Sequence, residues 1–149
     1  MSKLLESIQQ ISGEIVSKCI ECGLCTVRCI FSSEMTIPIR KIFKAICYGE
    51  ESILETKDIW ICTACFSCNV KCVRGINIPK VIGALRKLRL RKGPVNLIVT
   101  CELCQKQFIT APIINFIKRR LADKPVNETI LKLCPSCRGR LTAQILAKF

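Results

Sequence analysis

Apolar residues recur at helical spacing through the first part of the chain. Between residues 3 and 16, one helical face carries Leu4, Leu5, Ile8, Ile11 and Ile15. A second helix is predicted through the segment IPIRKIFKAIC, with Thr36 as its N-cap, Pro38 in its first turn and Gly49 ending it. A third helix is predicted over residues 79–92, again with a proline in its first turn. The first part of the chain is therefore expected to be mainly helical.

The helical pattern stops at Gly93 and Pro94, which we take as the boundary between two domains. Beyond it, residues 95–101 (VNLIVTC) and residues 128–134 (ETILKLC) predict two short strands. A helix is expected between them over residues 113–121, and the last segment, LTAQILAKF, predicts a short closing helix. The fold class that follows is mainly α, with a helical domain first and a small α+β domain after it.

Cysteine supplies 13 of the 149 residues, a density that would indicate a disulfide framework in a short secreted chain. The N-terminal segment MSKLLESIQQISGEIV argues against secretion, because polar residues interrupt it and it has no small-residue cleavage site. No apolar run approaches the roughly 20 residues needed to span a bilayer, so no transmembrane segment is expected. We therefore expect a cytoplasmic protein whose thiols are reduced or bound to metal.

Eight of the cysteines form two copies of the pattern C-x2-C-x2-C-x3-C, offset by 43 residues. An iron of a cubane cluster needs a soft, anionic ligand, which thiolate supplies, and the two-residue gaps let one loop reach three corners of the cube. Disulfides do not suit this compartment, and zinc favours separated pairs of cysteines. The pattern therefore predicts two [4Fe–4S] clusters.

In proteins with two such runs, the fourth cysteine of each run binds the other cluster. The predicted ligands of the first cluster are Cys19, Cys22, Cys25 and Cys72. Those of the second cluster are Cys62, Cys65, Cys68 and Cys29. This crossing would hold the two clusters close together and so provide a path for single electrons.

Three residues near these runs leave alternatives open. Gly23 either turns backbone N–H groups toward sulfur or forms an ordinary turn. Trp60 either shields the second cluster from water or is simply part of the core. Cys47, which belongs to neither run, is expected to be a packed structural thiol on an apolar helix face.

The segments CIECGLCTVRC, IPIRKIF, DIWICTACFSCNVKCVRGINIP and KVIGALRKLRLRKG make residues 1–93 resemble the C subunit of heterodisulfide reductase. That family consists of small ferredoxin-like proteins with two [4Fe–4S] clusters. The resemblance implies two protein partners, a flavin- and cluster-containing subunit and a cysteine-rich catalytic subunit. Ile30 and Val73 stand where family members often carry proline, which puts loop rigidity and potential in doubt. Residues 94–149 are expected to lie outside the usual family pattern.

The remaining four cysteines form two C-x2-C pairs in residues 94–149, at Cys101, Cys104, Cys134 and Cys137. The segment CPSCRGRL has the Pro and Gly of a rubredoxin or zinc-ribbon knuckle. Four thiolates in a tetrahedral array suit structural Zn²⁺, and the closed site leaves no open position for catalysis. A single redox-active iron, or no stable metal, are the alternatives. The tail is thus predicted to be a zinc-ribbon-like domain.

The formal net charge is +13 at pH 7. Two clusters and one zinc site, each with four thiolates and a net charge of about −2, would lower this to roughly +7. The segment RKLRLRK at residues 86–92 holds five of the positive charges. It is either a solvated helix face or a docking surface for an acidic partner, while nucleic-acid binding is disfavoured because aromatic residues are scarce.

We expect an electron-transfer subunit of a heterodisulfide-reductase-like complex, without a small-molecule substrate or catalytic residues of its own. The sequence contains no histidine, the usual proton-transfer residue. Any enzyme activity should belong to the complex. The alternatives are an iron-sulfur subunit of another respiratory or sulfur-metabolising oxidoreductase, and a basic zinc-ribbon protein that binds nucleic acid.

Overall fold

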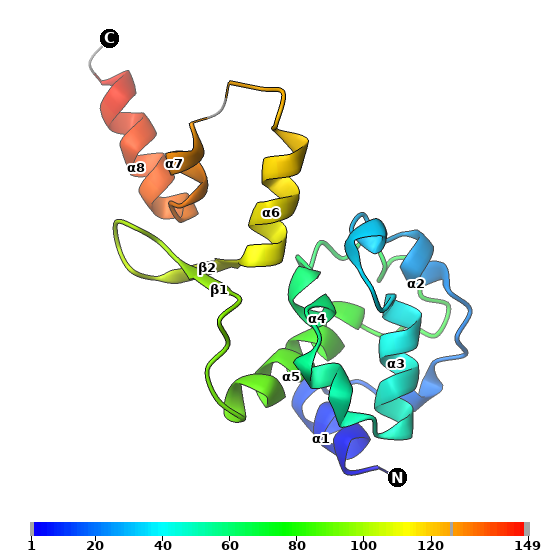
Figure 1. The fold of residues 1–149 in the computed structure, drawn as a ribbon. Coiled ribbons are helices and arrows are strands. Elements are labelled where there is room, and N and C mark those ends of the chain that lie inside the picture. The colour runs from blue at the N-terminus through cyan, green and yellow to red at the C-terminus, as the bar shows by residue number, and fades with distance from the viewer. Residues whose placement is uncertain (1, 126, 148–149) are drawn as a thin grey trace. The chain divides into compact units, whose positions relative to one another are not determined.

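In the computed structural model, which describes residues 2–125 and 127–147, the chain divides between Pro94 and Val95 into two units (Figure 1). The N-terminal unit contains five α-helices: α1 (Lys3–Ser12), α2 (Leu24–Val27), α3 (Ile39–Tyr48), α4 (Asp58–Ile61) and α5 (Ile78–Arg91). Three short 3₁₀ segments join them: Val16–Lys18, Ser32–Glu34 and Glu51–Glu55. The prediction of a mainly helical first part is confirmed.

The ends of these helices follow local chemistry. Helix α1 begins at Ser2, whose hydroxyl oxygen accepts a hydrogen bond from the Leu5 N–H at 3.3 Å. It ends at Gly13 rather than continuing to residue 16, because the positive φ of 70° there breaks the helix. Helix α3 ends at Gly49, as predicted, with a φ of 79°. Helix α5 is capped by the side chain of Asn77.

The prediction that Thr36 caps α3 is wrong. Pro38 is the residue that precedes the helix, and the Thr36 N–H donates instead to the carboxylate of Asp58 at 2.8 Å. The same carboxylate accepts from the Ile37 N–H at 3.1 Å. Asp58 is only 2% exposed. This buried carboxylate therefore holds the segment before α3 against α4, the helix that leads into the second cysteine run.

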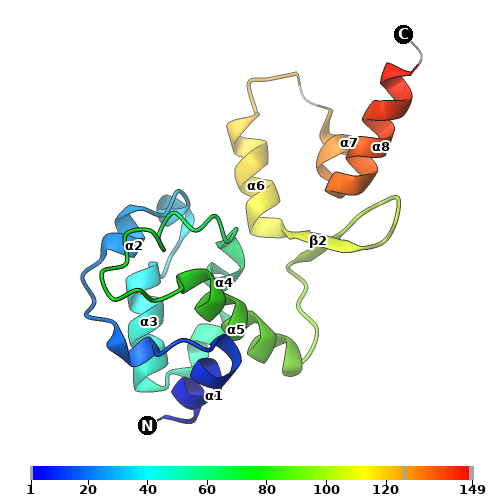
Figure 2. The same ribbon diagram turned by 180° about the vertical axis from the view of Figure 1, so that it is seen from behind.

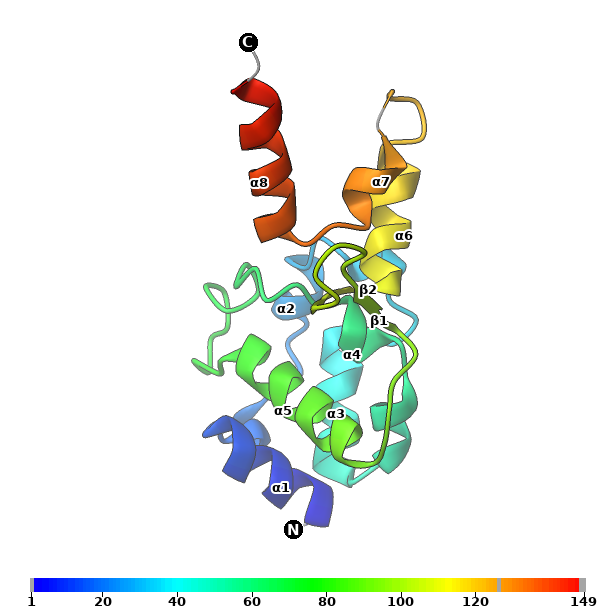
Figure 3. The same ribbon diagram turned by 90° about the vertical axis from the view of Figure 1, so that its left-hand side faces the viewer.

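The apolar core of the N-terminal unit lies among α1, α3 and α5, and α4 packs against α5. Its fully buried side chains include Ile8 from α1, Ile42 and Ile46 from α3, and Ile82 and Leu85 from α5. Figure 3 shows α1 lying next to α5. The core therefore forms without contribution from the predicted cluster ligands, apart from Cys68.

Over residues 95–125 and 127–147, the C-terminal unit contains two strands and three helices: β1 (Ile98–Thr100), β2 (Gln107–Thr110), α6 (Ala111–Arg120), α7 (Glu128–Leu131) and α8 (Pro135–Leu146). The strands form an antiparallel hairpin in which Val99 pairs with Ile109, and the register is irregular after Val99. The unit is thus α+β as predicted, and β1 lies within the first predicted strand.

The second predicted strand, residues 128–134, is wrong, because this segment begins with helix α7. The side chain of Asn127 accepts from the Thr129 N–H at 2.9 Å and caps the helix. Glu128 in the first turn pairs with Lys118 of α6 at 2.6 Å. The closing helix also starts earlier than predicted, at Pro135, and the end of the segment predicted for it lies outside the described residues.

The buried cluster of the C-terminal unit consists of Leu133 and three cysteines, Cys101, Cys134 and Cys137. Phe108 and Cys104 pack against it. The thiols are thus themselves the centre of this unit. Among the residues that the structure describes, no helix of either unit combines the length and apolarity needed to cross a bilayer.

Candidate metal centres

The two cysteine runs of the N-terminal unit repeat the same backbone shape. In the first run, Glu21 has a φ of 55° and Gly23 a φ of 81°. The matching positions of the second run, 43 residues later, are Ala64 with a φ of 54° and Phe66 with a φ of 61°. Left-handed backbone at residues other than glycine costs about 1–2 kcal/mol each. Both loops therefore keep a strained, tightly curved conformation that the sequence indicated only at Gly23.

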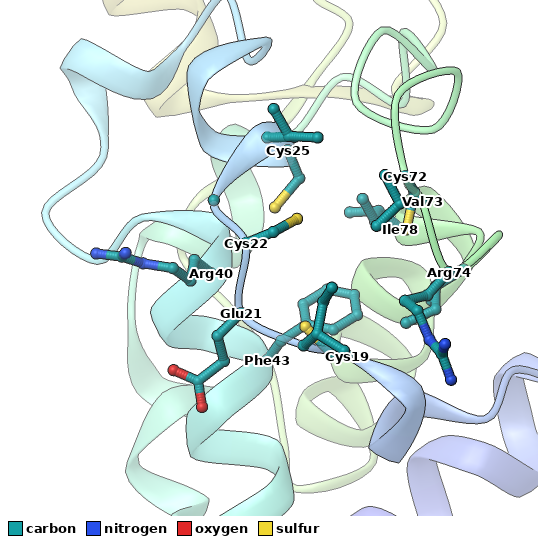
Figure 4. Close-up of a pocket in the computed structure, with 14 residues that line it drawn as sticks. Cys19, Glu21, Cys22, Cys25, Arg40, Phe43, Cys72, Val73, Arg74 and Ile78 are labelled. Carbon is teal, nitrogen blue, oxygen red and sulfur yellow. The ribbon is translucent and has the colours of Figure 1, made fainter.

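Three cysteines of the first run and the last cysteine of the second line one pocket. Figure 4 shows the sulfur atoms of Cys19, Cys22, Cys25 and Cys72 directed toward the same space. The loop that carries Cys72 lies beside the α2 segment in Figures 1 and 2. Residues that are 47 positions apart in the sequence, Cys25 and Cys72, are thereby brought to one site.

The walls and the rim of this pocket differ in character. Phe43 and Ile78 provide apolar wall, so water is partly excluded. Arg40 and Arg74 stand at the rim, and in Figure 4 their guanidinium groups are directed away from the sulfurs. The Nε of Arg74 donates to the Lys18 carbonyl oxygen at 3.1 Å, just before Cys19.

The other four cysteines form a second group. Burial raises the pKa of the Cys29 thiol, and the nearby Cys62 and Cys65 raise it further. Burial, followed by the proximity of Cys62, Cys29 and Cys65, raises the pKa of Cys68 to about 12. The Cys29 sulfur therefore lies near sulfurs of the second run, although Cys29 follows Cys25 by only four residues.

The raised pKa values have a chemical consequence. A thiol whose pKa is raised stays neutral at pH 7, and a metal must displace its proton in order to bind. Cys65 differs from Cys29 and Cys68, because hydrogen bonding with the side chain and the backbone of Ser67 lowers the pKa of its thiol. Cys65 is also exposed. It is therefore the thiol of this group best placed to meet an incoming cofactor first.

The second group has a partly buried cationic neighbour. Arg86 of α5 donates from Nε to the Ile59 carbonyl oxygen at 2.7 Å and from Nη2 to the Cys62 carbonyl oxygen at 2.5 Å. Its guanidinium lies 5.6 Å from the centre of the Trp60 ring, which is 4% exposed. Trp60 is therefore a core residue. Arg86 was predicted only as one of five charges on a helix face.

Two further sequence expectations are refined by the structure. Cys47 is half-buried, and burial raises the pKa of its thiol, with smaller contributions from Cys19 and Glu21. It thus lies close to the first group without lining the pocket. In the basic segment 86–92, Arg89 pairs with Glu55 and Lys92 pairs with Glu51 within the unit. Fewer of these charges are free for a partner than the sequence suggested.

In the C-terminal unit, the ligand atoms of Cys101, Cys104, Cys134 and Cys137 all lie within 4.8 Å of one another. The Sγ atoms of Cys104 and Cys134 are 3.6 Å apart. Four sulfurs at Zn–S distances of about 2.3 Å from one ion would be separated by similar lengths. The four thiols therefore fit a tetrahedral metal ion.

The first pair of this site lies in the loop between β1 and β2, where the Cys101 N–H donates to the Lys106 carbonyl oxygen at 2.9 Å. The second pair starts a helix: Cys134 precedes α8 and Cys137 lies in its first turn. The positive end of the helix macrodipole thus faces the thiols. A zinc ribbon was expected to place the second pair on a strand, and the helix replaces it because Pro135 favours the first helical position.

Hydrogen bonds support negative charge on these sulfurs. The Cys134 N–H donates to Cys101 Sγ at 3.3 Å, and Arg140 Nη2 donates to Cys137 Sγ at 3.2 Å. Burial acts against ionisation of Cys101, but N–H groups including those of Cys134 and Cys104 lower its pKa to about 6. The site is arranged to bind a cation.

Comparison with known proteins gives a consistent result. A family model described as a 4Fe-4S dicluster domain matches residues 15–76. The C2 iron-sulfur subunit of CoB–CoM heterodisulfide reductase from Methanocaldococcus jannaschii is 30% identical over 101 residues, covering 65% of this chain and 54% of the relative. The C subunit of the ferredoxin:CoB–CoM heterodisulfide reductase from Methanosarcina mazei is 32% identical over 93 residues, 62% of this chain and 58% of the relative. The chain thus spans little more than half the length of these two proteins.

One relative aligns with the whole chain. The C subunit of the ferredoxin/F420H2-dependent CoB–CoM heterodisulfide reductase from Methanosarcina acetivorans is 28% identical over 155 residues, covering 100% of this chain and 96% of the relative. The expectation that residues 94–149 lie outside the family pattern is therefore wrong for this relative.

Proposed function

Since the chain belongs to the family of heterodisulfide reductase iron-sulfur C subunits, we propose that it passes single electrons between a flavin- and cluster-containing subunit and a cysteine-rich catalytic subunit of such a complex. The observation that carries the proposal is the gathering of the last cysteine of each run with the first three of the other. That arrangement provides two adjacent four-thiol sites in one unit.

One [4Fe–4S] cluster is held by Cys19, Cys22, Cys25 and Cys72, and the other by Cys62, Cys65, Cys68 and Cys29. Each bound cluster supplies chemistry in the form of reversible one-electron oxidation and reduction. The residues of this chain fix the spacing of the sulfurs through the curved loops and exclude water with the apolar walls. The strain at Ala64 and Phe66 supports the assignment, since such strain persists mainly at functional sites.

A docking surface for the partner subunits lies on the loops that carry the cysteines. Four repeat-related apolar side chains are strongly exposed there: Val27 (79%), Ile30 (61%), Val70 (80%) and Val73 (62%). Arg28 and Lys71, also exposed, stand between them. An apolar patch with basic members fits a partner surface that is apolar with acidic members, because complementary charge steers association. Ile30 and Val73, which replace the proline common in the family, belong to this patch.

The C-terminal unit holds one structural Zn²⁺ through Cys101, Cys104, Cys134 and Cys137. Two observations support this assignment. The four thiols lie at mutual distances suited to one tetrahedral ion, and three of the four cysteines are buried. A buried, fully ligated ion stabilises the fold and leaves no open position for a substrate. Mononuclear iron in the same site is the alternative, and metal analysis distinguishes the two ions.

The test is anaerobic purification of the full chain, followed by metal, sulfide and EPR analysis. The proposal expects about eight irons with matching sulfide, about one zinc, and a signal of two interacting clusters on reduction. Mixed with the partner subunits, the reduced chain should be reoxidised by the catalytic subunit, and a Val27→Glu, Val70→Glu double variant should react more slowly. A colourless protein without sulfide contradicts the proposal, as does a chain whose reduced clusters exchange no electrons with either subunit.

A further inference from the structure

Arg86 is placed where it can set both the position and the charge environment of the second cysteine group. It lies in α5, outside both cysteine runs, yet its contacts are with three residues that lead into the second run: Ile59, Trp60 and Cys62. Two of these contacts are hydrogen bonds to carbonyl oxygens at the C-terminal end of α4. Carbonyl groups at the C-terminal end of a helix lack hydrogen-bond donors within the helix, and the guanidinium of Arg86 supplies donors for two of them.

This contact also determines where the cysteine loop starts. Helix α4 has four residues, and Cys62 follows it directly in extended conformation, with a φ of −60° and a ψ of 122°. The planar fork of the guanidinium holds the Ile59 and Cys62 carbonyl groups together, which a lysine ammonium cannot do with the same geometry. Arg86 therefore fixes the direction in which the chain leaves α4 toward Cys65 and Cys68.

The charge of Arg86 is not balanced by a carboxylate in the described part of the chain. Burial lowers the pKa of this guanidinium, while the Cys62 sulfur acts to raise it. An arginine stays protonated in proteins, so a positive charge sits partly buried beside the second group. Charges act more strongly there than at the surface, because water screens them less.

The arginines that line the pocket of the first group, Arg40 and Arg74, are both exposed, whereas Arg86 is partly buried. Arg74 makes a related contact, donating to the Lys18 carbonyl oxygen just before Cys19, but Arg74 is exposed. Arg40 and Arg74 both direct their guanidinium groups away from the sulfurs (Figure 4). The two groups thus differ in electrostatics although their loops share one backbone shape.

We infer that Arg86 is a positioning residue for the second cysteine group that also compensates its negative charge, and so makes the cluster held there easier to reduce than the cluster of the first group. The inference rests on the proposed ligand sets. Reduction adds one electron and makes the site more negative by one charge, which a nearby, partly buried cation favours. The electron in the test comes from a chemical reductant used as titrant.

The experiment is an EPR-monitored redox titration of the full chain, purified anaerobically, in four forms: wild type, Arg86→Gln, Arg86→Lys and the control Lys87→Gln. Lys87 is exposed and adjacent, so the control removes one solvent-exposed charge and leaves the partly buried charge of Arg86 in place. A Cys65→Ser variant identifies which signal belongs to the second group. Iron content is measured in every form.

With iron content unchanged, we expect Arg86→Gln to shift the reduction potential of the second cluster to more negative values, several times further than Lys87→Gln does. The reduction potential of the first cluster should stay unchanged. In Arg86→Lys, which keeps the positive charge, the reduction potential of the second cluster should lie close to the wild-type value. The inference is overturned if Arg86→Gln shifts the reduction potentials of both clusters equally or shifts neither. It is also overturned if Arg86→Gln and Arg86→Lys shift the potential of the second cluster by the same amount. If Arg86→Gln loses iron, loss confined to the cluster that Cys65→Ser identifies supports the positioning role, and loss from the first cluster or from both clusters overturns it. Normal iron with unshifted potentials leaves the proposed function intact, so the two failures are distinguishable.

Discussion

In the N-terminal unit most of the fully buried side chains are aliphatic, such as Ile8, Ile42 and Leu85, and most cysteines lie in half-exposed loops. In the C-terminal unit the buried centre is made of Cys101, Cys134 and Cys137, with Leu133 as its one buried aliphatic member among the described residues. In the first unit the candidate metal sites lie outside an apolar core, whereas in the second unit the candidate metal ligands themselves form the core. Loss of metal should therefore have different consequences in the two units.

The largest effect is expected from Cys134→Ser. Structural zinc sites contribute about 10–16 kcal/mol of apparent binding free energy, and a unit without another sizeable core cannot fold without it. We predict loss of zinc and rapid amide hydrogen exchange throughout β1, β2 and α8, with the helices of the N-terminal unit still protected. Cys47→Ser, which removes a cysteine outside all three sites, is the matched control and should keep its zinc. Retained protection in the C-terminal unit of Cys134→Ser would contradict this view.

The next largest effect concerns the crossed ligand sets. Cys72→Ser should disturb the same cluster as Cys22→Ser, although Cys72 belongs to the other run. Cys29→Ser should in turn reproduce the EPR changes of Cys65→Ser. We expect partial loss of iron in all four variants, because each removes one of four ligands. If each substitution altered only the cluster of its own run, the crossed assignment would be wrong.

A smaller effect is expected at Asp58, which belongs to the metal-independent core. Asp58→Ala leaves the Thr36 and Ile37 N–H groups without an acceptor, and we expect it to lower the free energy of unfolding of the N-terminal unit by about 3 kcal/mol. Denaturant unfolding followed by circular dichroism measures this. Glu55→Ala, which removes an exposed pair with Arg89, should cost under about 1 kcal/mol. Equal effects of the two substitutions would show that Asp58 is not a structural link.

The sequence predicted best those features that depend on local pattern. Helices α1, α3 and α5 and strand β1 follow from spacing and from Gly and Pro punctuation, and they are confirmed within a few residues. The segment 128–134 was wrongly predicted as a strand, since a short apolar run fits either structure and the Asn127 cap decided between them. The ligand sets stay a prediction, although the structure gathers the cysteines as the spacing indicated.

Features that depend on distant contacts could not be predicted. The role of Asp58 requires residues 36 and 37 to reach α4, and no local pattern encodes that approach. Arg86 looked like one member of a charged helix face, and only the packing of α5 against α4 gives it a partly buried position with hydrogen bonds to α4. The left-handed backbone at Ala64 and Phe66 was hidden because neither residue favours it.

The two cysteine runs offer the finest comparison, because they reach one backbone shape with different residues. Gly23 tolerates its φ of 81° and has room for a methyl group, whose nearest neighbour would be Arg40 Cδ at 3.9 Å. Gly23→Ala should therefore lower the free energy of unfolding only through backbone strain, by about 1 kcal/mol. Ala64→Gly, at a φ of 54°, should raise it by a similar amount.

Gly83→Ala is the control for this pair. Gly83 lies inside α5 and would place its new methyl group in open space, so alanine should stabilise the helix by up to about 1 kcal/mol. The same substitution thus has opposite signs at positions 23 and 83, and denaturant unfolding of the N-terminal unit measures both. If Gly23→Ala were stabilising, or Ala64→Gly destabilising, the left-handed backbone conformation would not be intrinsic to the two cysteine loops. The chain would then adopt it only when a cluster is bound.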